Sequence, residues 1–169
     1  MHPVDAFFFT EMKVLKFGGS SVGTPERIRE VKRIVDAQVL PCVVIVSAFQ
    51  GVTNQLHKIA ELAADNKTEA WDLLGKITSL HRDVASTLVP DKKKRVEVLK
   101  YVDDILNELT ETCTGIFLLH EITKHSLDIV LAAGERLSSR IISAFIETSI
   151  YADARNFIIT NARTGNNVV

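Results

Sequence analysis

A lysine, two glycines and two serines stand together near the start of the 169-residue chain, in the segment Lys16-Phe17-Gly18-Gly19-Ser20-Ser21. Because glycine carries no Cβ, the backbone there can approach an anion closely, and successive amides before a helix can hold phosphate oxygens. Lys16 would add a positive charge beside a transferring phosphoryl group. The lysine precedes the glycines and no Gly-Lys-Ser/Thr follows, so the segment is not a Walker loop. Two interpretations stay open, a phosphate site and an ordinary turn.

A second group of polar residues follows the apolar run that ends at Val46, in the segment Ser47-Ala48-Phe49-Gln50-Gly51-Val52-Thr53-Asn54. Gly51 gives this loop its flexible point. Ser47 and Thr53 offer hydroxyl groups beside the free amides of a helix start, and such a site suits a small carboxylate. The alternative is that Thr53 only caps its own helix.

Charged residues gather in two further segments, Gly134-Glu135-Arg136-Leu137-Ser138 and Asp153-Ala154-Arg155. The first lies inside a helical pattern, where a glycine costs about 1 kcal/mol relative to alanine and so indicates a packing or approach requirement. Glu135 and Arg136 are otherwise interpreted as a surface ion pair. The second segment is interpreted as a buried ion pair that organises a loop. The five histidines show no H-x-x-x-H or H-E-x-x-H pattern, so no metal site is predicted.

The first two segments follow predicted strands. Residues 12–17 are short and apolar-rich and end in two glycines, which is typical of a strand entering a loop. A helix is expected to start at Thr24-Pro25 and to end near Leu40-Pro41. The β-branched run 42–46 predicts a second strand that is covered on both faces. Strand, helix and strand in this order form a βαβ unit, so the sheet is expected to be parallel.

Helical spacing dominates the rest of the chain. A helix is expected to begin at Thr53. Three more long helices are expected, at residues 68–88, 91–112 and about 126–149. The first two of these join at Val89-Pro90 as a helical hairpin inserted between strand units, and Gly115 is expected to end the second. Residues 157–160 give a short strand signal.

The composition is that of an ordinary globular protein, with 46% hydrophobic and 24% charged residues. A net charge of −1 gives no electrostatic footprint for nucleic acid. No apolar stretch approaches the about 20 residues of a membrane span. Cys42 and Cys113 are interpreted as reduced thiols of a cytoplasmic protein. Residues 1–11 have no signal-peptide pattern and are interpreted as an extension or a cloning leftover before a strand that starts at Met12.

Taken in order, the four segments resemble the signatures of the aspartate kinase family, within the amino-acid kinase superfamily. The resemblance covers about residues 12–165 and rests on Lys16–Val22, Val46–Leu56, Gly134–Ser139 and Asp153–Arg155. It implies an α/β fold, a three-layer αβα sandwich with a mainly parallel sheet and the inserted helical hairpin. It also identifies residues 12–169 as the N-terminal, amino-acid-binding part of a truncated kinase domain.

The resemblance implies roles for individual residues. The nucleotide site would comprise Lys16, Phe17, Gly18, Gly19, Ser20 and Ser21. Within it, Lys16 would contact the ATP phosphates and act in catalysis. The L-aspartate site would comprise Ser47, Thr53, Asn54 and Glu135. Glu135 would pair with the α-ammonium group of the substrate. No metal ligand is implied within the chain, because Mg²⁺ would enter as a complex with ATP.

The implied activity is ATP-dependent phosphorylation of the side-chain carboxylate of L-aspartate to 4-phospho-L-aspartate, the first step toward lysine, threonine and methionine. The family's Gly-Arg-Gly-Gly-Ser-Asp loop does not occur here, and its nucleotide-base pocket and second phosphate-contacting lysine are not found either. The chain is therefore expected to be a fragment that lacks the nucleotide-base half and retains at most residual activity alone. The full-length protein is expected to be a cytoplasmic homo-oligomer without nucleic-acid or membrane partners.

Two other functions remain as alternatives. Another amino-acid kinase, such as an acetylglutamate or uridylate kinase, would share the glycine-rich first loop, but the segments 47–56 and 134–138 argue against it. A non-catalytic module for interaction or regulation would account for the abrupt C-terminal end.

Overall fold

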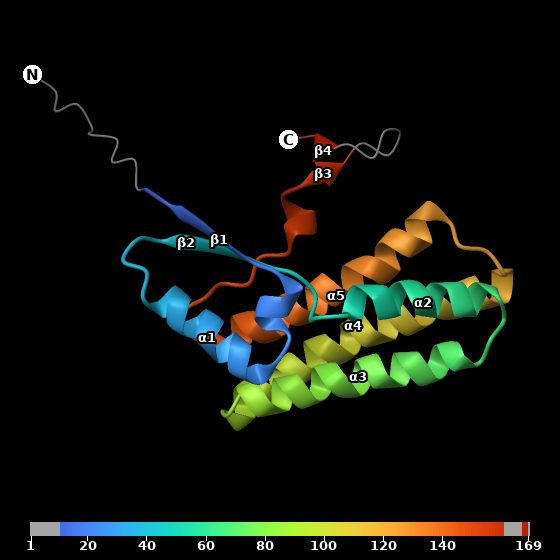
Figure 1. The fold of residues 1–169 in the computed structure, drawn as a ribbon, viewed down its shortest axis with the longest axis horizontal. Coiled ribbons are helices and arrows are strands. Elements are labelled where there is room, and N and C mark those ends of the chain that lie inside the picture. The colour runs from blue at the N-terminus through green and yellow to red at the C-terminus, as the bar shows by residue number, and fades with distance from the viewer. Residues whose placement is uncertain (1–10, 161–166, 169) are drawn as a thin grey trace, which may run out of the picture.

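A computed structural model describes residues 11–160, 167 and 168 of the chain, and helices form most of this part (Figure 1). The α-helices are α1 (Pro25–Asp36), α2 (Val52–Ala64), α3 (Glu69–Leu88), α4 (Lys92–Leu119) and α5 (Lys124–Phe145). The strands are β1 (Lys13–Phe17), β2 (Cys42–Val46), β3 (Ile159–Thr160) and β4 (Asn167–Val168). Two short 3-10 helices are η1 (Gly19–Val22) and η2 (Ala154–Asn156). Of the expected extension at residues 1–11, only Glu11 lies in the described part.

Strands β1 and β2 pair in parallel along their full length, which confirms the predicted βαβ unit. The crossover is α1, and it begins as predicted. The Thr24 hydroxyl accepts a hydrogen bond from the Arg27 amide at 3.4 Å, and Pro25 occupies the first turn. The helix ends at Asp36, before the predicted end at Leu40-Pro41.

The other four α-helices, α2 to α5, pack against one another as a bundle at one end of the two strands (Figure 1). Helices α3 and α4 form the predicted hairpin, joined by the short turn 89–91. Between the helices lies the core, and its completely buried side chains include Leu56, Ile59, Ile77, Leu109, Leu137 and Ile141. The bundle therefore supplies most of the buried apolar surface that stabilises this part of the chain.

Helix α4 extends to Leu119, so the prediction that Gly115 ends it is wrong. The apolar face continues across the glycine, because Cys113 and Ile116 are both buried. This packing outweighs the about 1 kcal/mol that a glycine costs inside a helix. The helix ends instead at His120, which takes the left-handed backbone conformation with a φ of 55°.

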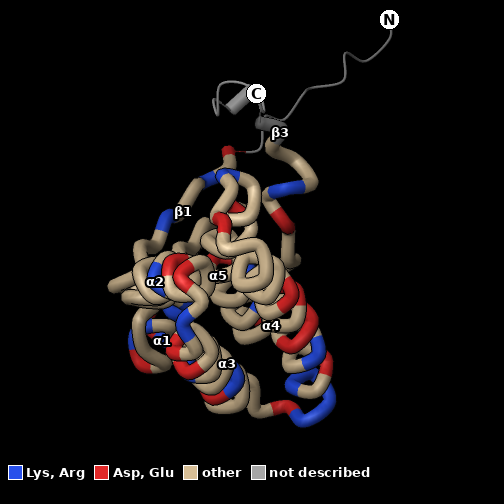
Figure 2. The backbone as a smooth tube through the Cα atoms, turned by 90° about the vertical axis from the view of Figure 1, so that its right-hand side faces the viewer, with Lys and Arg blue, Asp and Glu red and all other residues tan. Residues whose placement is uncertain are grey.

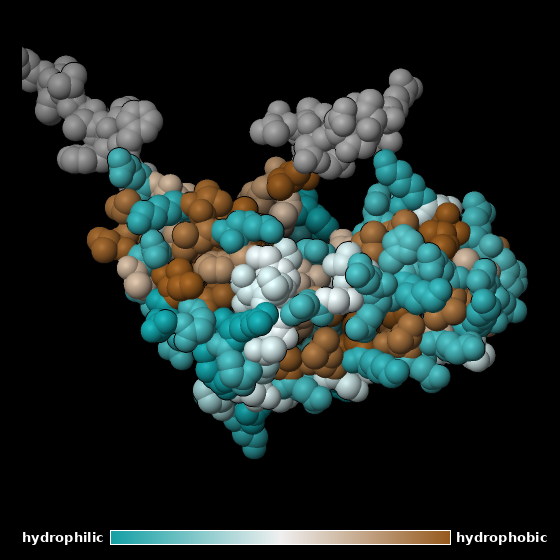
Figure 3. Space-filling model, viewed as in Figure 1, coloured by the Kyte–Doolittle hydropathy of each residue, from teal (hydrophilic) through white to brown (hydrophobic). Residues whose placement is uncertain are grey.

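Strand β2 is not covered on both faces within the described residues, contrary to the sequence prediction. Helix α5 packs against the sheet from one side. On the other side Val43 and Ile45 of β2 are 44% and 49% exposed, and Val14 of β1 is 64% exposed. Figure 3 shows apolar residues at the surface of this region. A β-branched run predicts a strand, but it does not reveal what covers each face.

The predicted fold class is confirmed in part. The described residues contain the parallel pair β1–β2 with helices, while β3 and β4 form a separate antiparallel pair. The strand predicted at residues 157–160 is limited to its last two residues. Helix α5 starts two residues before its predicted range and ends at Phe145 rather than near residue 149.

Acidic and basic residues are interspersed along α3 and α4, as Figure 2 shows, in keeping with the net charge of −1. The described helices are amphipathic, with buried apolar residues on one side and exposed charged residues on the other. None of them combines the length and the hydropathy that crossing a membrane requires.

Candidate active site

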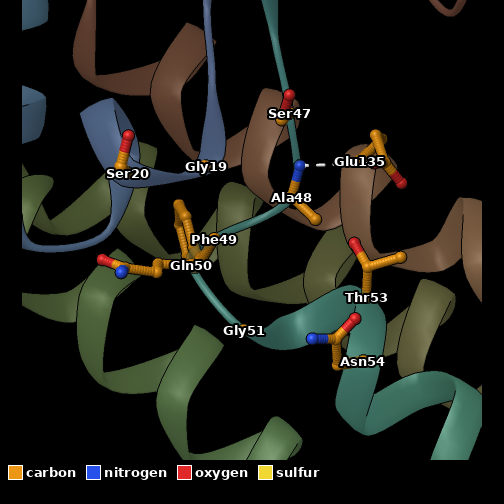
Figure 4. A pocket seen from close by; sticks show the side chains of 10 residues that line it. All are labelled: Gly19, Ser20, Ser47, Ala48, Phe49, Gln50, Gly51, Thr53, Asn54 and Glu135. Atoms are coloured by element: carbon orange, nitrogen blue, oxygen red, sulfur yellow. Dashed lines mark hydrogen bonds between the residues drawn. The ribbon is translucent and has the colours of Figure 1, made fainter.

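A pocket of about 300 Å³ opens where the carboxyl ends of β1 and β2 meet the starts of η1 and α2 and the middle of α5 (Figure 4). Its lining residues are Gly19, Ser20, Ser47, Ala48, Phe49, Gln50, Gly51, Thr53, Asn54 and Glu135. They come from three segments that are far apart in the sequence. We call residues 47–51 the pocket loop and residues 18–23 the glycine loop.

The parallel pairing of β1 and β2 brings these two loops together, because the carboxyl ends of parallel strands lie at the same edge of a sheet. The Ser47 amide donates a hydrogen bond to the Phe17 carbonyl at 3.0 Å, which extends the strand pairing into the pocket loop. A Cβ on Gly19 would lie 3.0 Å from the Ala48 carbonyl oxygen. The glycine therefore lets the two loops approach each other closely, whereas a larger residue would push them apart.

Helix α5 forms the third wall and is held close to the pocket loop. A Cβ on Gly134 would lie only 2.9 Å from the Ala48 Cβ. The glycine therefore lets α5 come close to the pocket loop, which is the kind of close approach predicted from its place inside a helix. The buried Ser138 hydroxyl donates to the Ser47 carbonyl at 2.9 Å. The Ala48 amide donates to Glu135 Oε1 at 3.5 Å, the bond drawn in Figure 4. These contacts aim the Glu135 carboxylate into the pocket.

The start of α2 forms the pocket floor, and it differs from the prediction at Thr53. The N-cap of α2 is Gly51, with a left-handed φ of 83° and no side-chain capping bond, so Thr53 does not cap the helix. The Val52 amide donates to the Phe49 carbonyl at 3.0 Å. Thr53 and Asn54 lie in the first turn and line the pocket. The positive end of the helix dipole therefore lies at the cavity, and the first turn of α2 has neither an acidic residue nor a side-chain cap.

Six of the ten sequence-predicted site residues meet in this one pocket, namely Gly19, Ser20, Ser47, Thr53, Asn54 and Glu135. The other four, Lys16, Phe17, Gly18 and Ser21, do not line it. Lys16 is exposed at the end of β1, and its Nζ lies 3.7 Å from the place that a Cβ on Gly18 would take. The lysine Nζ thus lies beside the glycine loop, and Lys16 is not among the residues that line the pocket.

Four lining residues were not among the predicted site residues, namely Ala48, Phe49, Gln50 and Gly51. Ala48 and Phe49 are each 3% exposed, so they line the pocket with their backbone while their side chains pack inward. For Ala48 and Phe49, the sequence signal that would have found them is an apolar pair in the loop directly after the β-branched run 42–46.

The interpretation of Glu135 and Arg136 as a surface ion pair is wrong, because adjacent residues of a helix point in different directions. Arg136 pairs with Glu108 of α4 at 2.8 Å, and this hydrogen bond lowers the pKa of the Glu108 carboxyl. Glu135 is left to face the pocket.

The ion pair predicted between Asp153 and Arg155 is present at 2.7 Å, but it is not buried. The Asp153 side chain is 19% exposed and that of Arg155 is 56% exposed. Hydrogen bonds from Arg155 lower the pKa of the Asp153 carboxyl. Asp153 also accepts from the Arg155 amide at 3.0 Å and so caps η2. The pair organises a surface turn, because the chain here lies outside the helix bundle.

Within the described residues there is no cluster of three or more histidine, cysteine or acidic side chains with the geometry of a metal site. Glu135 is the only ionisable residue among those that line the pocket. One carboxylate is too few to hold a magnesium ion by itself. The pocket combines the Glu135 carboxylate with the start of α2, which has no side-chain cap.

Several known proteins are similar in sequence to this chain. The amino acid kinase family matches residues 11–161. Aspartokinase 1, chloroplastic, of Arabidopsis thaliana is 33% identical over 141 residues, which covers 80% of this chain and 23% of that protein. The aspartokinase of Chlamydia trachomatis is 30% identical over 156 residues, which covers 89% of this chain and 32% of that protein.

The fold is shared with a solved structure, that of E. coli aspartokinase III in complex with aspartate and ADP. The TM-score is 0.81 at 21% sequence identity, and the match covers 93% of this chain and 34% of that one. This chain therefore spans at most about a third of the length of these relatives. The family match extends over nearly all of its residues, and the chain belongs to the amino acid kinase family.

Proposed function

We propose that the pocket binds L-aspartate and that the chain is the amino-acid-binding part of an ATP-dependent aspartate kinase. The observation that carries this proposal is the pairing of Glu135 with the uncapped start of α2 in a single pocket. A carboxylate and a positive helix end together complement an amino acid, which carries one ammonium group and at least one carboxylate. The aspartokinases among its relatives support aspartate as that amino acid.

Each side of the pocket has a distinct part in substrate binding. Glu135 would accept hydrogen bonds from the α-ammonium group of aspartate. The hydroxyls of Ser47 and Thr53, the Asn54 side-chain amide and the backbone amides of Thr53 and Asn54 would donate to carboxylate oxygens. Convergence of these groups on one small pocket would fix the orientation of the substrate before reaction.

The glycine loop would supply the phosphate side of the reaction. A side-chain carboxylate oxygen of aspartate attacks the γ-phosphorus of ATP, and the bond from that phosphorus to the β,γ-bridging oxygen breaks. The products are 4-phospho-L-aspartate and ADP. Amides at Gly19 and Ser20 would donate to phosphate oxygens, and Lys16 would neutralise charge that develops on them. Mg²⁺ would enter as a complex with ATP.

The test is a ligand titration of the 169-residue chain, followed by chemical shifts of the amides of residues 47–54. L-Aspartate is compared with succinate, which keeps both carboxylates and lacks the ammonium group. Acetylglutamate and UMP are added to test the other amino-acid kinase activities. We expect aspartate to bind at least about tenfold more tightly than succinate, because only aspartate can pair with Glu135.

The variant Glu135→Gln should remove most of this preference, because the neutral amide no longer attracts the ammonium group. Glu121→Gln, which changes an exposed glutamate between α4 and α5, is the matched control and should keep the preference. Equal binding of aspartate and succinate to the unchanged chain, or tighter binding of acetylglutamate or UMP, would contradict the proposal.

A further inference from the structure

A buried histidine of α3 lies directly against the pocket loop. The Phe49 ring stacks on the imidazole of His81, with the ring centroids 5.0 Å apart and the planes 14° from parallel. His81 is completely buried and Phe49 is 3% exposed. The contact joins the helical hairpin of α3 and α4 to the loop that forms one wall of the site.

The structure also fixes the protonation state of this imidazole. His81 Nδ1 lies 2.7 Å from the Ile77 carbonyl oxygen, and a carbonyl only accepts, so Nδ1 carries the proton. Nε2 has no hydrogen-bond partner among the described residues. A second proton would place an unpaired N–H and a charge in the core, and burial accordingly lowers the pKa of His81. The ring is neutral, and the hydrogen bond to Ile77 sets its plane.

We propose that His81 is a positioning residue of the pocket, whose neutral ring supports Phe49 and thereby sets the backbone of the pocket loop. The expected effect of His81 on ligand affinity rests on the proposed function, whereas its expected effect on the order of the pocket loop does not.

The path from His81 to the site runs through two backbone contacts on either side of Phe49. The Phe49 carbonyl accepts the hydrogen bond from the Val52 amide that starts α2. Its neighbour Ala48 donates to Glu135 across the pocket. A Phe49 ring without its stacking partner would shift both contacts, and with them the helix start and the acidic side chain of the site.

Two substitutions separate the ring of His81 from its hydrogen bond. His81→Phe keeps a flat ring against Phe49 and loses the bond to Ile77. His81→Asn keeps a donor near the place of Nδ1 and loses the ring. Phe49→Leu removes the ring from the other side of the stack, and it decides the question if His81→Asn does not fold.

Ile116→Ala serves as the matched control for a smaller side chain in the core. Ile116 is buried in α4, next to Phe117, whose ring lies 5.6 Å from that of Trp71. Trp71 precedes His81 by ten residues of α3, a distance of about 15 Å along the helix. The control therefore opens the same bundle far from the pocket loop.

The measurement is amide hydrogen exchange of residues 48–53 in the 169-residue chain. We expect His81→Asn and Phe49→Leu to speed exchange in these residues by about tenfold or more relative to Ile116→Ala, and His81→Phe to keep them within about threefold of the unchanged chain. Exchange in His81→Asn that matches Ile116→Ala would overturn the proposal. So would exchange in His81→Phe that equals that in His81→Asn.

Titration with L-aspartate supplies the second readout. His81→Asn should weaken aspartate binding by about fivefold or more, and His81→Phe should restore most of the affinity. If the unchanged chain does not bind aspartate, the proposed function is wrong, and the exchange experiment alone decides the role of His81.

Discussion

Gly134 is the residue at which α5 comes closest to the pocket loop. Replacement of a helix-interior glycine by alanine ordinarily stabilises a protein by up to about 1 kcal/mol. Here the added Cβ would lie 2.9 Å from the Ala48 Cβ and 3.2 Å from Leu56 Cδ1. We therefore expect Gly134→Ala to lower the free energy of unfolding by about 1–3 kcal/mol, measured by urea denaturation.

Gly75→Ala is the control for this prediction. Gly75 lies inside α3, and a Cβ there would meet nothing within 4 Å. This variant should raise the free energy of unfolding by about 0.5–1 kcal/mol. If both variants stabilise the chain, α5 and the pocket loop are not in tight contact.

His81 also makes stability depend on pH. Burial lowers its pKa in the folded chain below the ordinary value of 6.5, so below about pH 6.5 the unfolded chain binds a proton that the folded chain does not. The contribution of His81 to the free energy of unfolding is therefore fully present above that pH. It falls as the pH drops below it, with a slope of at most about 1.4 kcal/mol per pH unit.

Urea denaturation of the unchanged chain and of His81→Phe between pH 5 and 8 measures this contribution. The difference between the two free energies of unfolding should change below about pH 6.5 and stay constant above it. A difference that is the same at every pH would show that His81 does not titrate on unfolding in this range.

At the scale of elements, the start of α4 tests the contribution of capping. The Asp91 carboxylate accepts a hydrogen bond from the Lys94 amide at 2.7 Å. It also precedes three lysines, whose positive charges oppose the dipole at a helix start. Asp91→Ala should lower the free energy of unfolding by about 0.5–2 kcal/mol, as followed by thermal or urea denaturation.

Thr68→Ala is the matched control, because Thr68 is the N-cap of α3 and makes no side-chain capping bond. It should change the free energy of unfolding by less than about 0.5 kcal/mol. An equal loss in both variants would mean that the Asp91–Lys94 bond does not stabilise α4.

The starts of α1 and α2 show why caps are only partly predictable. Thr24 caps α1 as its position before Pro25 predicts. Thr53 occupies a similar place before an apolar run, yet the Val52 amide is taken by the Phe49 carbonyl and the helix starts one residue earlier. The difference comes from the left-handed conformation at Gly51 and from the packing of Phe49 on His81, a residue 32 positions away in the sequence.

At the scale of the whole molecule, Cys113 reports the cooperative unfolding of the bundle. It is completely buried in α4, and burial raises the pKa of its thiol to about 11. The thiolate is the reactive form, so alkylation at pH 8 requires the bundle to open. We expect iodoacetamide to modify the half-buried Cys42 well before Cys113, as measured by mass spectrometry of peptides.

The denatured chain provides the control for this prediction, because in urea both cysteines should react at similar rates. Addition of urea below the unfolding midpoint should speed the alkylation of Cys113 in proportion to the unfolded fraction. Equal rates in the native chain would mean that α4 does not stay packed against its neighbours.

The sequence by itself determined the local pieces of this protein and the family to which it belongs. Periodicity and turn residues predicted the βαβ unit, the helical hairpin and the long last helix, because these depend on interactions within a few residues. The glycine and hydroxyl segments, together with Glu135 of the charged segment 134–138, supplied six predicted residues that do meet in one pocket. The lysine and three other residues of the first segment stayed outside it.

Only the tertiary structure decided which residues face one another. The separation of Glu135 from Arg136, the close approach at Gly134 and the support of Phe49 by His81 all depend on contacts between distant segments. No local pattern encodes such contacts, because a helix or strand looks the same in sequence whichever neighbour its apolar face meets. The pocket takes its shape from how these elements pack, and the sequence specifies its parts.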